Sequence, residues 1–131
     1  MIAFDTNLLV RLAVDDHPQQ ADVAENLLKQ HRVLISRTVL LETEWVLRSR
    51  YKIPPERIHA FFQLMMQTEN AELEDAPAIA RALIWYEQGA DFADALHLAA
   101  CGDAVLHTFD RGFCKAARAA GNAPEVRIWE V

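Results

Sequence analysis

The sequence has few of the features that mark several common classes of protein. It contains two cysteines, Cys101 and Cys114, without a short metal-binding spacing, so we expect reduced thiols and no disulfide framework. No apolar run approaches the roughly 20 residues of a membrane-spanning helix. The first residues lack a basic region followed by a long apolar stretch, which argues against a signal peptide. Together these absences predict a cytoplasmic protein with no membrane segment.

Basic residues are outnumbered, with 13 Lys and Arg against 19 Asp and Glu and a formal net charge of -6. This balance excludes a protein that coats nucleic acid through bulk charge. It does not exclude an enzyme that acts on nucleic acid, because basic side chains gather in the segment from residue 32 to residue 57. The five histidines are scattered without the spacing of a zinc site.

Short apolar segments alternate with amphipathic ones along the 131 residues, and no linker or repeat interrupts them. The pattern predicts strands at 2–5, 33–35, 71–75, 105–109 and 126–129. It predicts helices at 19–31, 37–51, 91–101 and 111–120. Two more are predicted, one that starts at the Pro54-Pro55 pair and one that starts near Pro77 and ends before Gly89. We therefore expect one α/β domain, residues 1–131, with a mainly parallel sheet and helices on both faces.

Four acidic residues lie beside apolar segments. Asp5 follows Ile2-Ala3-Phe4, Glu42 and Asp94 lie inside apolar helices, and Asp110 closes the segment 105–109. Carboxylates are rarely buried unless they are paired or bind a metal. Asp5 and Asp110 are expected at the carboxyl ends of strands, where parallel sheets bind ligands. The sequence thus predicts one anionic pocket that a divalent cation neutralises.

The first two acids also have structural interpretations. Asp5 could cap the helix that follows it. Glu42 could pair with Arg37 or Arg48, and Glu44 is an equal candidate for the site by composition.

The acids of the second half have similar alternatives. Asp91 and Asp94 could cap a helix and favour its dipole, and Asp110 could cap a helix that begins near Arg111. A shared chemical role explains all four acids together. Mg²⁺ and Mn²⁺ prefer carboxylate oxygen and water as ligands. Such ions activate a water and stabilise charge on a phosphoryl group.

At these positions the chain resembles the PIN-domain family, in particular the VapC-type ribonuclease toxins of bacterial toxin–antitoxin pairs. The resemblance implies a three-layer α/β/α domain that cuts single-stranded or looped RNA with Mg²⁺ or Mn²⁺. The matching stretches are Ile2-Ala3-Phe4-Asp5-Thr6-Asn7, Leu40-Leu41-Glu42-Thr43-Glu44-Trp45-Val46-Leu47, Asp91-Phe92-Ala93-Asp94-Ala95-Leu96-His97-Leu98-Ala99-Ala100 and Thr108-Phe109-Asp110-Arg111-Gly112-Phe113.

Position by position, the resemblance implies that Asp5 and Asp94 are the principal metal ligands. Glu42 would complete the first site, and Asp110 would support a second ion or the water. Glu42 is preferred to Glu44 because the family's acid lies three residues before a Trp-Val-Leu-like segment. Three further residues are implied as outer ligands or as hydroxyl groups that bind a carboxylate or a phosphate: Thr6, Thr108 and Asp91.

The resemblance also implies partners. Family members act as homodimers held by helices near residues 19–65, and a cognate antitoxin covers the acidic pocket. The apolar residues Phe61, Phe62, Met65 and Met66 could form such a surface or belong to the core. Two other functions stay open: a non-catalytic PIN-like binding module, and a phosphotransfer or receiver-like domain. The second is disfavoured by Asp-Thr-Asn after the first strand, where phosphatases of this kind need Asp-x-Asp.

Overall fold

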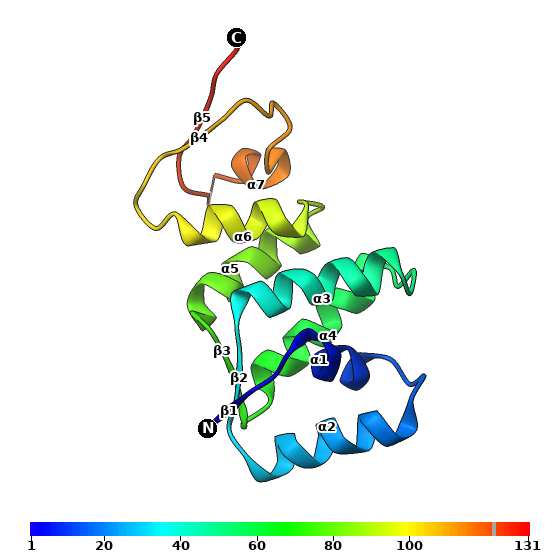
Figure 1. Cartoon of the computed structure of the whole chain (residues 1–131). Helices are drawn as coiled ribbons and strands as arrows, with labels where there is room; N and C mark the ends of the chain where they lie inside the picture. Colours follow the sequence, from blue (N-terminus) through cyan, green and yellow to red (C-terminus); the bar gives the residue numbers. More distant parts are fainter. Residues whose placement is uncertain (122) are drawn as a thin grey trace. The chain divides into compact units, whose positions relative to one another are not determined.

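A computed structural model of the chain describes residues 1–121 and 123–131 (Figure 1). The chain divides into two compact units, Met1–Ala76 and Pro77–Val131. Each unit is described by itself below. Among the described residues, no helix is long and apolar enough to cross a membrane.

Unit 1 is built around three parallel strands in the order β1 (Ile2–Ala3), β2 (Val33–Ile35) and β3 (Ala71–Leu73). Parallel strands need long crossover connections. Helices α1 (Thr6–Ala13) and α2 (Pro18–Gln30) connect β1 to β2, and α3 (Arg37–Ser49) and α4 (Pro55–Gln67) connect β2 to β3. The predicted strands and helices of this unit are confirmed, with ends that differ by two residues or fewer.

Local sequence explains where these helices begin. The Ser36 hydroxyl accepts a hydrogen bond from the backbone N–H of Val39 at 3.2 Å, so the predicted cap of α3 is confirmed. Helix α4 begins at Pro55, a position where the missing N–H of proline costs no helical hydrogen bond.

The core of unit 1 lies between its sheet and its helices. Phe62 and Met65 of α4 belong to it, whereas Phe61 and Met66 are half-buried. The apolar stripe of α4 is therefore largely a core feature, and fully burying one such side chain contributes about 1.5–3 kcal/mol. Besides Phe62, the large apolar residues of unit 1 with no exposed surface are Leu9, Val33, Ile35, Leu40, Leu47 and Ile58.

Unit 2 begins with α5 (Ala76–Glu87), whose first residue is the last of unit 1. The elements that follow are α6 (Phe92–Ala100), β4 (Leu106–Thr108), α7 (Lys115–Ala119) and β5 (Val126–Ile128). Strands β4 and β5 are parallel, with Leu106 opposite Val126. The ring of Phe92 meets Tyr86 edge-on, with centroids 5.1 Å apart. Every strand pairing in the described residues is parallel, so the predicted α/β fold class is confirmed.

The predicted helix 111–120 was wrong at its start, because α7 begins at Lys115. A turn precedes it: the Asp110 carbonyl accepts from the N–H of Phe113 at 3.2 Å, and an Asp110 carboxylate oxygen accepts from the N–H of Gly112 at 2.9 Å. Cys114 then adopts a left-handed conformation with φ 45°, which a right-handed helix cannot include. Asp110 therefore holds a turn and does not cap α7.

Candidate active site

The first acid, Asp5, lies just beyond β1 and is the N-cap of α1. One of its carboxylate oxygens accepts from the backbone N–H of Thr6 at 2.7 Å. The capping interpretation of Asp5 is therefore correct. The capping hydrogen bond leaves Asp5 able to bind a ligand, because the side chain is exposed and its carboxylate has a second oxygen.

Glu42 of α3 is held beside the start of α1. The hydroxyl of Thr6, a residue only 5% exposed, donates to a carboxylate oxygen of Glu42. Glu42 itself is exposed. Since Thr6 directly follows Asp5, this contact brings two of the predicted site residues to one place in unit 1. The sequence spacing of 36 residues between Thr6 and Glu42 gave no sign of this contact by itself.

Glu44 has a different role from Glu42. It is 2% exposed, and the guanidinium of Arg48 donates to it at 2.8 Å from Nε. Arg37 lies against Glu74, with Nη2 and a carboxylate oxygen 3.5 Å apart. Arg48 and Arg37 thus have acidic partners other than Glu42, contrary to the structural alternative. Of the two neighbouring acids on α3, Glu42 is the one that faces solvent.

Three further acids gather in unit 2. Asp91 is the N-cap of α6, and its carboxylate accepts from the backbone N–H of Asp94 at 3.0 Å. Asp94 lies in the first turn of α6 and is half-buried. Asp110 follows β4, and its backbone N–H donates to the hydroxyl of Thr108 at 3.0 Å. A helix start and a strand end therefore present carboxylates from separate parts of the sequence.

The electrostatics show that these carboxylates act on one another. Burial raises the pKa of Asp94, and the negative charges of Asp91 and Asp110 raise it further. Burial also raises the pKa of the Cys114 thiol to about 11, helped by Asp94 and Asp91. Unit 2 therefore contains an anionic cluster, which we define as Asp91, Asp94 and Asp110. A cation of the hard, oxygen-binding type fits this set of donors and would relieve its repulsion.

The acids do not form a closed metal cage. Within residues 1–121 and 123–131, no group of three or more His, Cys, Asp or Glu side chains is arranged to hold an ion. The carboxylates of the anionic cluster are near enough to interact electrostatically, but coordination of Mg²⁺ needs distances of about 2.0–2.1 Å. Direct coordination of one ion by these carboxylates would therefore require their side chains to rotate.

The raised pKa of Asp94 predicts how stability depends on pH. Folded Asp94 keeps its proton to a higher pH than the unfolded chain does, so stability is lost as the pH rises through the folded-state pKa. In EDTA we expect Asp94→Asn to raise the Tm at neutral pH and to leave it unchanged at a pH below the ordinary aspartate pKa. Thermal unfolding of both proteins across this range measures the difference, and a lower Tm for the variant at neutral pH would contradict it.

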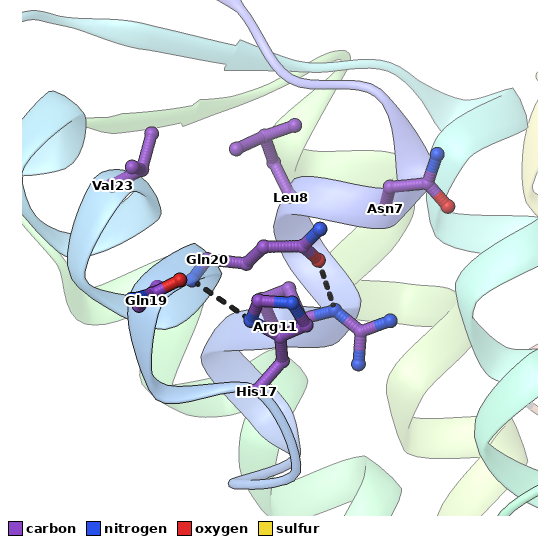
Figure 2. A pocket seen from close by; sticks show the side chains of 7 residues that line it. All are labelled: Asn7, Leu8, Arg11, His17, Gln19, Gln20 and Val23. Carbon is purple, nitrogen blue, oxygen red and sulfur yellow. Dashed lines mark hydrogen bonds between the residues drawn. The ribbon is translucent and has the colours of Figure 1, made fainter.

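A hollow in unit 1 was not predicted from the sequence. It has a volume of about 480 Å³ and is formed by α1, α2 and the segment before α2 (Figure 2). Inside it, Nε of Arg11 donates to the side-chain oxygen of Gln20 at 2.8 Å, and the N–H of Gln20 donates to the ring of His17 at 3.3 Å. Arg11 also pairs with Asp16. No sequence motif marks these residues, because their meeting depends on how α1 packs on α2. The lining residues are Asn7, Leu8, Arg11, His17, Gln19, Gln20 and Val23.

Comparison with known families settles what kind of domain carries these acids. The sequence profile of the PIN domain matches residues 2–119 of the chain. The chain belongs to the PIN-domain family. PIN domains are generally nucleases and typically depend on metal ions, so the prediction of a nuclease fold is confirmed. The PIN match includes all four predicted ligands, Asp5, Glu42, Asp94 and Asp110. No curated protein matches this PIN domain.

Proposed function

We propose that the protein is a metal-dependent endoribonuclease that cleaves phosphodiester bonds of RNA. The observation that carries the metal requirement is the anionic cluster, in which a helix start and a strand end bring Asp91, Asp94 and Asp110 together. Carboxylates that repel one another next to a substrate polyanion need a cation before the substrate can approach. The PIN-domain match supports the nuclease activity.

The proposed metal is Mg²⁺, with Mn²⁺ as a substitute, and the proposed ligands are Asp5, Glu42, Asp94 and Asp110. These four residues offer carboxylate oxygen alone, which is the ligand type that both ions prefer. When bound, such an ion lowers the pKa of a water molecule and stabilises charge on the phosphoryl group.

The other proposed site residues contact the proposed ligands at a carboxylate or at the backbone. Thr6 donates its hydroxyl to Glu42 from a buried position, so it limits the rotation of that side chain. Thr108 accepts from the N–H of Asp110 and fixes the start of the turn. Asp91 caps α6 and thereby orients the helix turn that bears Asp94. The family resemblance implies an outer-ligand role for Asp91, and for the two threonine hydroxyls a hydrogen bond to a carboxylate or a phosphate. Of these, the Thr6–Glu42 contact is the one that supports the proposal directly.

We further propose that the protein is a cytoplasmic toxin of the VapC type, active as a homodimer and silenced by a cognate antitoxin. The four motifs that resemble this group support the proposal. The proposed partners would cover exposed apolar side chains on the helices of unit 1. These include Leu64, 59% exposed, and Trp45, 48% exposed. The PIN match crosses both units, which supports treating residues 1–131 as a single domain.

The test is cleavage of total bacterial RNA by the antitoxin-free protein in Mg²⁺, in Mn²⁺ and in EDTA. We expect discrete fragments with either ion and none with EDTA, because the carboxylates need a cation to accept the RNA. The product of a small open reading frame next to this one, added in excess, should stop the cleavage. Fragments that persist in EDTA would contradict the metal requirement. Intact RNA under every condition would favour a non-catalytic binding module.

A further inference from the structure

An exposed cluster of rings lies at the end of β4 and β5 in unit 2. It consists of His107, Phe109 and Trp129, which we call the aromatic surface. Phe109 is 73% exposed and Trp129 is 49% exposed. His107 belongs to β4, Phe109 lies one residue beyond it, and both line the same hollow. The backbone N–H of Trp129 donates to the Thr108 carbonyl at 2.9 Å, which places Trp129 beside them.

Two rings of this surface, those of His107 and Trp129, hold each other in fixed orientations. Nε1 of Trp129 donates to Nδ1 of His107 at 2.7 Å, and the two rings stack with centroids 5.9 Å apart and planes 21° apart. A ring that is already oriented loses little conformational freedom when a ligand stacks on it. The aromatic surface borders a hollow of about 570 Å³, lined by His107, Thr108, Phe109, Trp129 and Val131. This volume is within the range of sites that bind small molecules.

The position of the surface connects it to the proposed cleavage site. Phe109 directly precedes Asp110. Thr108 also lines the hollow, and its hydroxyl accepts from the N–H of Asp110. Arg111 follows with its side chain 77% exposed, and its Nε is 3.9 Å from Glu130. An exposed pair at this distance contributes little, so the guanidinium can exchange Glu130 for a phosphate. Apolar rings, a proposed metal ligand and a cation thus follow one another along the chain.

We propose that the aromatic surface binds a base of single-stranded RNA by stacking, next to the phosphate that the acidic site cleaves. The inference rests on the proposed function and names the part of the substrate that this face receives. Every base has a π-face, so stacking suits an enzyme that must hold unpaired RNA of varied sequence. The neighbouring Arg111 favours a polyanion over an apolar protein segment as the occupant. The surface therefore contributes substrate affinity, while the carboxylates contribute the chemistry.

The test is equilibrium binding of fluorescently labelled single-stranded RNA at low salt in Ca²⁺, a hard cation that binds carboxylates, with the RNA recovered afterwards to check that it is uncut. Low salt keeps the phosphate contacts strong. We expect Phe109→Ala to weaken binding about tenfold to a hundredfold, as loss of one stacked base does. Phe109→Tyr, which keeps the ring, should restore the affinity. Ile84→Ala, at a 50% exposed apolar position of α5 in the same unit, is the matched control and should bind as the wild type does.

A probe without bases separates stacking from charge. An abasic ribose–phosphate chain of the same length should bind the wild type and Phe109→Ala equally, because no base can stack. Equal affinities of these two proteins for normal RNA, or no RNA binding by the wild type, would overturn the proposal. So would self-association that Phe109→Ala abolishes without changing RNA affinity. Since binding is measured on uncut RNA, failure of the cleavage hypothesis alone would leave the Phe109 effect intact, and the two failures are distinguishable.

Discussion

Asp94→Asn is expected to lower the rate of metal-dependent RNA cleavage by about a hundredfold or more while the protein stays folded. Loss of a residue that only orients a ligand typically costs 10- to 100-fold, so loss of a ligand itself should cost at least as much. The asparagine keeps the size of the side chain and removes the charge that repels Asp91 and Asp110. Initial rates of cleavage of a defined RNA in Mg²⁺, at equal protein concentrations, measure the effect.

Asp103→Asn is the matched control for this substitution. Asp103 is an exposed acid of the same unit, and the change removes the same charge. We expect this variant to cleave as fast as the wild type and to gain the same Tm on addition of Mg²⁺, whereas Asp94→Asn should lose both responses. Full metal-dependent cleavage by Asp94→Asn would eliminate Asp94 as a ligand. A contaminating nuclease would cut equally in all three preparations.

Phe92→Ala should lower the free energy of unfolding by about 3–5 kcal/mol. Phe92 is 1% exposed, packs edge-on against Tyr86 and directly follows the cap of α6, Asp91. Its removal leaves a cavity beneath the helix turn that bears Asp94 and loses an aromatic pair contact. Denaturant unfolding followed by circular dichroism measures the change.

Phe109→Ala is a control with the same change of side chain in the same unit. Because Phe109 is 73% exposed, its truncation should change the free energy of unfolding by about 0.5 kcal/mol or less. Phe92→Leu should fall between the two, since leucine fills part of the cavity. Equal losses for Phe92→Ala and Phe109→Ala would show that the packing around Phe92 does not hold unit 2 together.

Local signals in the sequence were enough to predict most of the fold. Ser36 begins α3 and Pro55 begins α4 because the cap hydroxyl and the proline ring act on neighbouring backbone. The start of α7 could not be predicted in this way. In the turn before it, the Asp110 carboxylate accepts from the N–H two residues on, which is a common role of aspartate. The helix starts later because Cys114 is left-handed, a conformation that cysteine does not signal in a sequence.

The candidate site was predictable in its residues and not in its contacts. By composition, Glu42 and Glu44 were equal candidates for the site. On a helix, however, residues i and i+2 point about 200° apart, so only one of them can face it. The structure separates them, because the side of α3 that carries Glu44 packs inward with Leu40 and Leu47. The contact between Thr6 and Glu42 depends on the pairing of β1 with β2, which places the starts of α1 and α3 together. Such a contact follows from tertiary packing and has no local signal.

The two thiols of unit 2 differ in exposure, and this difference allows selective labelling of the protein. The thiolate is the reactive form of cysteine, and Cys114 is buried with a pKa raised to about 11, so it is protected at neutral pH. Cys101 is half-exposed and directly follows α6. A maleimide dye will therefore attach at Cys101, at the opposite end of the helix from Asp91 and Asp94. The natural sequence thus already carries a single labelling position from which a spectroscopic reporter can follow events at the acidic end of α6.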